Sequence, residues 1–379
     1  MTPSATAPTC QWYCAGDDIF RDMLAAIDAA RTAISFEIYI FSECPLGERF
    51  REALTRAAGR GVRVRTLVDA MGSLELSAKF WEPLQQAGGV VKWFNPIALK
   101  RMWIRNHRKL LVCDDRTAFI GGYNVATDYE GDGVTRGWRD MGLKIEGPLV
   151  SQLALSFDEM FARADLRHRF FPRLRKSPAK KTVSQPEGRL LFSGPGRGPS
   201  PIQRALITDL AGARDVKIIM AYFLPTWRMR RALMRVVRRG GTAQLILAGK
   251  SDVLLSQLAG RSLYRSLLAA GVEIYEYQPQ ILHAKLIVID DAVYTGSANL
   301  DPRSLQINYE LMIRFQKPEL VEGARKIFRQ TLEHSERVEP EAWRKSRTFW
   351  RRLKHRLAYW LLVRLDPWMA RWQWRSLPK

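Results

Sequence analysis

A pattern of eight residues, His-x-Lys-x-x-x-x-Asp, occurs twice in this chain of 379 residues. The two copies are His107, Lys109 and Asp114 in HRKLLVCD, and His283, Lys285 and Asp290 in HAKLIVID. Each copy is followed by a turn of small residues and an asparagine, as GGYN ending at Asn124 and GSAN ending at Asn299. The whole unit is therefore duplicated, and the fold has to accommodate two equivalent halves.

The duplication extends far beyond the motif. The segment ISFEIYIF, 34–41, corresponds to VKIIMAYFLP, 216–225, and a helical pattern that ends in glycine follows each of them. Equivalent residues keep similar separations: 183 for Tyr39 and Tyr222, 176 for His107 and His283, and 170 for Asp140 and Glu310. The repeated strands and helices predict an α/β fold of two lobes related by pseudo-twofold symmetry, each a mixed β-sheet flanked by helices. Such symmetry would bring both histidines to an active site at the lobe interface.

A single copy of this motif would be weak evidence for an active site, because the alternation of side chains along a strand also places a His and a Lys together on an ordinary solvated face. The chain has only five histidines, however, and two of them carry the complete pattern. Two imidazoles can divide an attack on a phosphodiester, one forming a covalent phosphoryl bond while the other protonates the leaving oxygen. Lysines and asparagines from both copies can hold the non-bridging oxygens. The motif therefore predicts phosphodiester chemistry without a metal or cofactor.

Together with GSANLDPRSLQINYE, 296–310, the doubled motif resembles that of the phospholipase D superfamily. Within it, the segments AYFLP and LVDAMGS and the chain length are similar to the shorter bacterial cardiolipin synthases, often called type B. The resemblance covers about residues 15–335. What it implies is transfer of a phosphatidyl group between two phosphatidylglycerol molecules, giving cardiolipin and glycerol through a phosphohistidine.

The resemblance also implies a role for each motif residue. His107 matches the nucleophile, and His283 matches the general acid that then becomes the base for the acceptor hydroxyl. The phosphate-holding and supporting groups are Lys109, Lys285, Asn124, Ser297 and Asn299. Asp140 and Glu310 match carboxylates that orient the imidazoles. Asp114 and Asp290 complete the motif, and we expect a supporting role for them as caps of the turns at which they lie.

The two copies differ in one spacing. From His107 to Asn124 is 17 residues, whereas from His283 to Asn299 is 16. A change of one residue reverses the direction of later side chains in a strand unless a tighter turn or a lost bulge absorbs it. Because the GSAN sequence is intact, we expect the turn near Asp290 to absorb the difference.

The formal charge of +22 is concentrated outside the repeats. Residues 163–181 contribute +7 and residues 341–379 contribute +9. This distribution predicts an N-terminal lobe (1–162), a basic linker (163–188), a C-terminal lobe (189–340) and a basic tail (341–379) that holds six of the twelve tryptophans. The four cysteines are irregularly spaced and suggest neither a zinc site nor a disulfide framework.

The tail carries an apolar stripe at helical spacing: Phe349, Trp350, Leu353, Leu357, Trp360, Leu361 and Leu365. Arg351, Arg352 and His355 fall on another face, and the apolar run 357–363 is too short to span a bilayer. This composition favours a helix in the headgroup plane of an anionic membrane, with the linker as a second contact, over a helix packed on its own domain. The N-terminus has no basic region before an apolar core, so we expect a peripheral protein at the cytoplasmic face of the inner membrane.

Other functions share these features. Basic charge with interleaved aromatic residues also fits a nucleic-acid phosphodiesterase. The charge lies in the linker and tail rather than along the repeats, which favours the anionic lipids phosphatidylglycerol and cardiolipin over nucleic acid. Two complete motifs argue against a non-catalytic membrane scaffold. Hydrolysis of phospholipid to phosphatidic acid stays open, because it uses the same residues and differs only in whether water reaches the covalent intermediate.

Overall fold

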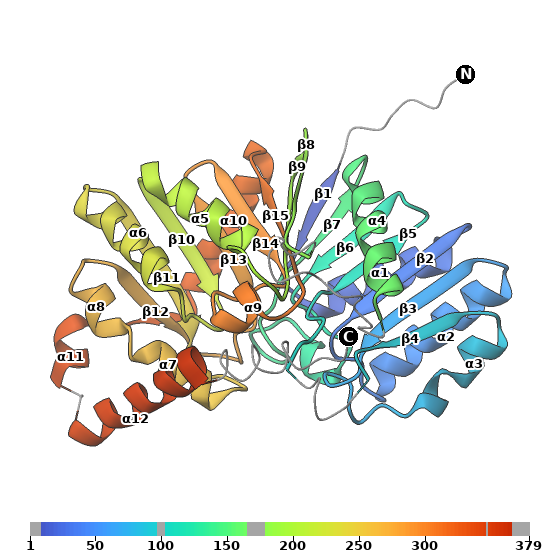
Figure 1. The fold of residues 1–379 in the computed structure, drawn as a ribbon, viewed down its shortest axis with the longest axis horizontal. Coiled ribbons are helices and arrows are strands. Elements are labelled where there is room, and N and C mark those ends of the chain that lie inside the picture. Colours follow the sequence, from blue (N-terminus) through green and yellow to red (C-terminus); the bar gives the residue numbers. More distant parts are fainter. Residues whose placement is uncertain (1–8, 97–102, 165–178, 346–347, 366–379) are drawn as a thin grey trace.

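Two mixed β-sheets, one from each half of the chain, lie side by side in the computed structural model (Figure 1). The structure describes residues 9–96, 103–164, 179–345 and 348–365. The first sheet contains β1 (Cys10–Tyr13), β2 (Ala33–Ile38), β3 (Arg63–Asp69), β4 (Val90–Phe94), β5 (Leu110–Cys113), β6 (Thr117–Gly121) and β7 (Gly142–Glu146). The second contains β8 (Thr182–Gln185), β9 (Gly188–Ser193), β10 (Asp215–Met220), β11 (Thr242–Ala248), β12 (Glu273–Tyr277), β13 (Lys285–Ile289), β14 (Ala292–Gly296), β15 (Glu310–Phe315) and β16 (Ser335–Arg337). The predicted α/β fold of two lobes is confirmed.

The two sheets repeat one strand order. The order β7-β6-β5-β2-β3-β4 in the first sheet corresponds to β15-β14-β13-β10-β11-β12 in the second. In each sheet three strands run parallel, and an antiparallel hairpin that begins just after the motif histidine pairs with the central strand, β2 or β10. The central strand β2 is buried along its whole length, as a strand covered on both faces should be.

Helices pack on both faces of each sheet (Figure 1). They are α1 (Gly16–Ala29), α2 (Pro45–Gly59), α3 (Glu82–Gln86), α4 (Leu149–Ala162), α5 (Pro201–Gly212), α6 (Trp227–Arg238), α7 (Leu254–Arg261), α8 (Tyr264–Leu268), α9 (Pro302–Gln306), α10 (Pro318–Leu332), α11 (Pro340–Lys345) and α12 (Phe349–Trp360). In α2 a proline at the first position begins the helix, and Leu46, Phe50 and Leu54 bury one face at intervals of four residues. After the helix, Gly61 takes a positive φ of 85°, which glycine allows at little cost.

The backbone just before each histidine joins the lobes. Asn106 forms a parallel bridge with Tyr309, and Leu282 forms the equivalent bridge with Arg139. The amide of each histidine then donates to the carbonyl of the same partner, at 3.0 Å and 2.8 Å respectively. Helices α4 and α10 add a hydrophobic core to which both lobes contribute. Symmetric backbone pairing therefore holds both motifs at the interface.

The spacing difference between the motif copies lies in the two hairpin turns. In the first lobe Cys113 pairs with Thr117, which leaves residues 114–116 in the turn. In the second lobe Ile289 pairs with Ala292, which leaves only residues 290 and 291. The strands on both sides of the turn keep equivalent partners, so the expectation that the turn absorbs the difference is confirmed.

The second sheet begins before residue 189, the boundary that the charge distribution predicted. Strand β8 lies within the range of the predicted linker and pairs with β9 at the edge of the sheet. Residues 165–178 of the linker and residues 366–379 of the tail lie outside the described residues. Within the ranges that the structure covers, no helix is both long and apolar enough to cross a bilayer.

The tail helix α12 packs on the second lobe. It lies beside α7 (Figure 1) and buries Ala358 and His355, whose ring stacks on Trp343 with 6.2 Å between the centroids. His355 therefore lies on the docked face of the helix and does not share an exposed basic face with Arg352. Five residues of the predicted apolar stripe stay exposed, whereas Leu361 and Leu365 are half-buried. The exposed residues are Phe349, Trp350, Leu353, Leu357 and Trp360. One helix thus packs on its own domain through one face and leaves an apolar stripe uncovered by the described residues.

Candidate active site

Both motif histidines line one cavity of about 340 Å³ between the lobes. The first lobe contributes Tyr39, Ile40, His107, Asn124, Tyr129 and Trp138. The second contributes Tyr222, Leu224, Asp252, Val253, Ser256, His283, Asn299, Asp301, Pro302, Arg303, Ser304, Asn308 and Leu362. Residues far apart in the sequence therefore meet at the interface, where the pseudo-twofold symmetry predicted a site.

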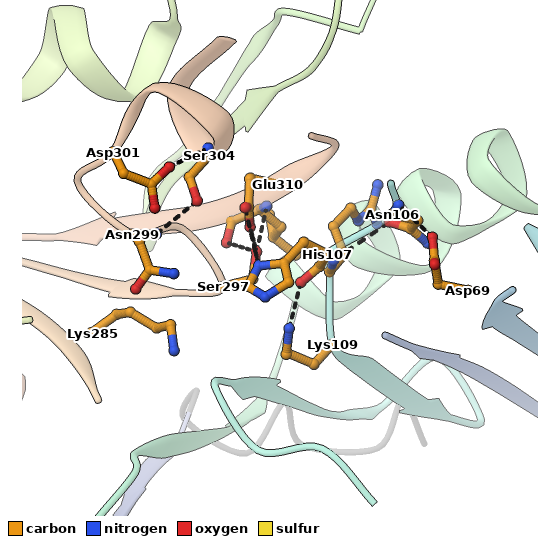
Figure 2. A network of polar contacts seen from close by, with 12 residues as sticks. Asp69, Asn106, His107, Lys109, Lys285, Ser297, Asn299, Asp301, Ser304 and Glu310 are labelled. Atoms are coloured by element: carbon orange, nitrogen blue, oxygen red, sulfur yellow. Dashed lines mark hydrogen bonds and ion pairs between the residues drawn. The ribbon is translucent and has the colours of Figure 1, made fainter. Parts of the chain in front are cut away.

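The carboxylate that contacts His107 comes from the other lobe. Nδ1 of His107 lies 3.0 Å and 3.2 Å from the two carboxylate oxygens of Glu310 (Figure 2). Ser297 Oγ donates to the same carboxylate at 2.5 Å. With a proton on Nδ1 for Glu310, Nε2 keeps its lone pair. Burial lowers the pKa of His107 to about 4 against the opposing effect of Glu310, so the imidazole is neutral near pH 7.

His283 is held in the reciprocal way. Its Nδ1 lies 2.6 Å from Oδ2 of Asp140, which belongs to the first lobe. Nζ of Lys285 lies 2.9 Å from the same nitrogen and 3.2 Å from Nε2, so the lysine packs against the ring. Burial and then the charge of Lys285 lower the pKa of His283, whereas Asp140 acts in the opposite direction. Each imidazole thus depends on a carboxylate from across the interface, and neither half of the site is complete within one lobe.

The two lobes support these carboxylates differently. In the second lobe the hydroxyl of Ser297 donates to Glu310. The equivalent position in the first lobe is Gly122, where a Cβ atom would lie 2.1 Å from Oδ1 of Asp140. Any side chain there would collide with the carboxylate, so the site requires glycine. Oδ1 of Asp140 accepts the amide of Met141 instead, at 2.7 Å.

The two motif lysines are buried beside the histidines. Nζ of Lys109 donates to the carbonyl of His107 at 2.7 Å and lies 5.1 Å from the ring centroid of Tyr39. Lys285 donates to the carbonyl of His283. Burial, followed by repulsion from Lys285, lowers the pKa of Lys109 to about 7, and burial also lowers the pKa of Lys285. A bound phosphate anion would favour the charged form of both ammonium groups, so the pair suits a phosphate site.

The motif asparagines differ in their freedom to contact a substrate. Oδ1 of Asn124 accepts the amide of Ile40 at 3.0 Å, and its Nδ2 donates to the hydroxyl of Tyr129 at 2.7 Å. Oδ1 of Asn299 is buried and has no hydrogen-bond partner among the described residues. A buried polar atom without a partner at a cavity is a candidate contact for a ligand. Asn299 is therefore the better placed of the two for such a contact.

Asp114 and Asp290 do not line the cavity. Each lies at the end of its hairpin strand that is remote from the histidine, and each accepts backbone amides of the loop before the central strand. The donors are Arg31, Thr32 and Ala33 for Asp114, and Arg214 and Asp215 for Asp290. Although burial acts to raise it, these amides lower the pKa of Asp114 overall. Both aspartates tie a hairpin turn to the sheet, as the expected capping role requires.

Sequence reasoning missed the aromatic residues around the histidines as site residues. Tyr39 stands edge-on to His107 with 4.8 Å between ring centroids, and Tyr222 stands edge-on to His283 at 6.3 Å. Tyr222 also donates to Asp252 at 2.6 Å. A signal for the two tyrosines was present, because the sequence repeat pairs them at a separation of 183 and each follows the central strand of its sheet, β2 or β10.

A buried polar network around Asn106 was also missed. Oδ2 of Asp69 accepts the amide of Asn106 at 2.8 Å (Figure 2), and Glu37 accepts its side-chain amide at 2.6 Å. Glu37 also pairs with Arg108 at 3.0 Å. Burial raises the pKa of both carboxyl groups. The matching positions in the second lobe are the apolar Ile219, Ala248, Leu282 and Ala284. Buried polar side chains thus support the backbone beside His107 but not the backbone beside His283. The sequence signal for this network was Glu37, the one acidic residue in the strand ISFEIYIF.

Comparison with known proteins agrees with this architecture. A family model described as cardiolipin synthase, PLD-like domain, matches residues 23–163 and 206–332. Cardiolipin synthase 1 of Bacillus anthracis is 32% identical over 357 residues, which cover 90% of this chain and 70% of that protein. Cardiolipin synthase B of Salmonella typhi is 32% identical over 302 residues, which cover 78% and 73% respectively. The crystal structure of phosphatidylserine synthase from Haemophilus influenzae has a TM-score of 0.72 at 13% identity, covers 95% of this chain and 94% of its own, and shows the same fold. The chain belongs to the family of cardiolipin synthases with a phospholipase D-like domain.

Proposed function

We propose that this protein transfers the phosphatidyl group of one phosphatidylglycerol to the free hydroxyl of a second, which forms cardiolipin and glycerol. The observation that carries the proposal is the pair of imidazoles in one cavity, each held by a carboxylate of the opposite lobe. Two imidazoles can supply a nucleophile and an acid. Membership of the cardiolipin synthase family supports phosphatidylglycerol as the substrate.

In the first half of the reaction, Nε2 of His107 attacks the phosphorus of the donor lipid. A P–N bond forms, the P–O bond to the glycerol headgroup breaks, and His283 gives its proton to the departing oxygen. The lowered pKa of His107 supports its role as nucleophile, because a neutral imidazole offers a lone pair. The bound phosphate anion would raise the pKa of His283 toward the protonated form that an acid needs. Lys109, Lys285 and Asn299 hold the non-bridging oxygens.

In the second half, the hydroxyl of another phosphatidylglycerol replaces glycerol. His283 takes the hydroxyl proton, the oxygen attacks phosphorus, and the P–N bond breaks to restore neutral His107. Transfer prevails over hydrolysis when the lipid hydroxyl, rather than water, occupies this position. The aromatic rings of Tyr39, Tyr129 and Trp138 in the cavity wall support transfer, because they limit the polar surface that could hold water.

Incubation of the purified protein with labelled phosphatidylglycerol in vesicles tests the reaction. Cardiolipin and glycerol in equal amounts are the expected products. Phosphatidic acid as the main product would select hydrolysis instead. Cleavage of a nucleic-acid phosphodiester with no turnover of lipid would select the nucleic-acid alternative.

A denaturing quench during turnover tests the roles of the two histidines. We expect labelled lipid to be trapped on His107, and His107→Ala to remove all trapping. His283→Ala should slow turnover by roughly 100-fold or more, as loss of an acid catalyst does, and leave some adduct. Trapping on His283 alone would reverse the two roles.

The proposed reaction needs no metal ion, because Lys109 and Lys285 supply the positive charge at the phosphate. In the described part of the chain, no three His, Cys, Asp or Glu side chains gather as a metal-binding group. Activity should therefore survive EDTA. Complete loss that one particular divalent ion restores would contradict this mechanism.

The proposed substrates lie in a bilayer, so the enzyme acts as a peripheral membrane protein, at the cytoplasmic face of the inner membrane. The exposed apolar stripe of α12 and the basic charge of the tail support contact with anionic lipids. Release from isolated membranes by high salt without detergent is the expected behaviour, because salt screens the attraction between charges. Release by detergent only would argue for a different attachment, and cleavage by protease added outside intact spheroplasts would place the enzyme on the other face.

A further inference from the structure

The catalytic cavity is lined by polar side chains where the phosphate would bind, among them His107, His283, Asn299 and Asp301. Apolar acyl chains gain nothing from such a lining, because the polar groups would lose their hydration without new hydrogen bonds. If the proposed function is correct, only the phosphodiester headgroup enters the cavity. The acyl chains then leave through the cavity mouth, so the residues around the mouth determine how the enzyme contacts the bilayer.

Apolar side chains of the second lobe connect the cavity with the outer surface. Val253 lines the cavity and is 40% exposed, and Leu254 beside it begins α7 and is 64% exposed. Leu362 also lines the cavity, and it belongs to η3 (Leu361–Leu365), a helical turn that directly follows α12. The tail helix α12 is therefore directly connected to the active site, because the next turn of the chain forms part of the cavity wall.

The exposed face of α12 continues this apolar surface. The exposed side chains are Phe349 (71%), Trp350 (68%), Leu353 (47%), Leu357 (55%) and Trp360 (52%). Among them Arg352, Lys354 and Arg356 are exposed as well, and residues 342–365 include no Asp or Glu. An apolar stripe in a segment whose charged residues are all cations complements the surface of an anionic bilayer.

The first lobe contributes an exposed apolar side chain from a loop that is hydrogen-bonded to the cavity wall. Leu74 is 63% exposed in the loop after β3, and this loop is the counterpart of the one that carries Val253 after β11. The hydroxyl of the neighbouring Ser73 donates to the carbonyl of Tyr39 at 3.1 Å, which ties the loop to the cavity wall. Exposed apolar residues thus come from equivalent loops of both lobes.

We propose that the first turn of α7, the exposed stripe of α12 and Leu74 form one docking surface, which seats the cavity mouth on an anionic bilayer. The acyl chains of the bound lipid stay in the bilayer beside Leu254 and Leu362, and the headgroup alone rises into the cavity. The acceptor lipid arrives by diffusion within the same bilayer. Water has little access to the covalent intermediate while the mouth is seated, which favours transfer over hydrolysis.

Leu254→Glu tests the docking surface, with Leu155→Glu as the matched control. Leu155 is 55% exposed on α4 of the first lobe and has no part in the docking surface. Sedimentation with phosphatidylglycerol vesicles should show binding weakened about tenfold or more by Leu254→Glu, the loss expected when one inserted leucine becomes a charge. Leu155→Glu should leave vesicle binding unchanged.

Turnover provides a second readout. The ratio of turnover on vesicles to turnover on short-chain phosphatidylglycerol below its micelle concentration should fall about tenfold or more for Leu254→Glu, in step with vesicle binding. The same ratio should stay constant for Leu155→Glu. Both positions are exposed, so neither change should unfold the protein, and melting curves check this.

Three outcomes would overturn the docking surface. The first is an equal effect of the two substitutions on vesicle binding, and the second is no effect of Leu254→Glu. The third is a wild-type dimer in light scattering that Leu254→Glu converts to a monomer, since a second copy would then cover the surface. Vesicle binding needs no turnover. A protein that binds vesicles through Leu254 yet makes no cardiolipin would refute the proposed function and support the docking surface.

Discussion

Replacement of Lys109 by methionine should stabilise the protein and remove its activity. Lys109 is 5% exposed, and burial, followed by repulsion from Lys285, lowers its pKa from 10.5 to about 7. At about 1.4 kcal/mol per pH unit, a charged Lys109 in the folded protein costs about 5 kcal/mol. The substitution also removes the hydrogen bond to the His107 carbonyl and the contact with Tyr39, each worth about 1 kcal/mol. The free energy of unfolding should therefore rise by roughly 3 kcal/mol.

The stabilisation should depend on pH in a defined direction. Below pH 7 the lysine is charged in both the folded and the unfolded protein, so its full cost is present. As the pH rises from about 7 to 10.5, the folded protein loses the proton that the unfolded chain still holds, and the cost declines. Above 10.5 both forms are neutral, and only the lost contacts remain, which favour the wild type.

Urea unfolding measures this effect, with Lys326→Met on the exposed face of α10 as the control. We expect Lys109→Met to gain roughly 3 kcal/mol near pH 6 and to lose roughly 1 kcal/mol near pH 10, and the control to change little at either pH. Inorganic phosphate should stabilise the wild type more than Lys109→Met, since the ammonium is its proposed partner. Turnover should fall by roughly 100-fold or more. A Lys109→Met protein that is less stable than wild type near pH 6 would refute the claim that this buried charge destabilises the fold.

Three further predictions concern the site and its support. Lys109 loses its charge as the pH rises through about 7, and His107 gains a proton as the pH falls through about 4. The value of kcat/KM should therefore be highest between about pH 4 and pH 7. A profile that stays flat to about pH 9 would contradict the role of Lys109. Asp140→Asn and Glu310→Gln should each lower kcat by roughly 10- to 100-fold with KM little changed, because each native carboxylate orients an imidazole. Circular dichroism checks the fold of both variants. A near-normal kcat in either variant would argue against orientation of the histidines across the lobes. Asp114→Ala should lower the free energy of unfolding by about 1–3 kcal/mol, because the backbone amides bound to Asp114 lose their acceptor. Turnover per folded molecule should persist. A stable but inactive variant would show that Asp114 takes part in the reaction.

The duplicated sequence was sufficient to predict two lobes and a shared cavity whose wall includes both motif histidines and both motif asparagines. Equivalent hydrophobic patterns fold into equivalent sheets, and twofold symmetry brings equivalent edges together, so His107 and His283 had to approach each other. The turn near Asp290 was predictable for a similar reason, because side-chain alternation cannot tolerate a shift of one residue. These conclusions rest on local patterns that the order of residues along the chain specifies directly.

Only the tertiary structure decided which carboxylate orients which histidine. Asp140 follows His107 by 33 residues, yet its partner is His283, which is 143 residues away. Glu310 follows His283 by 27 residues, yet it contacts His107 across 203. The exchange arises because the backbone before each histidine pairs with the opposite lobe, and no spacing within one repeat records that pairing.

The packing of the tail helix α12 was likewise decided only by the tertiary structure. Helical spacing identified the apolar stripe that contains Leu357, but periodicity defines a face of a helix and not its neighbour. In the folded protein α12 packs beside α7, buries His355 and Ala358, and leaves the side chains from Phe349 to Trp360 on its other face exposed. Which face of an amphipathic helix becomes buried is decided by the shape and chemistry of the surface that it meets, and that surface exists only after the second lobe has folded.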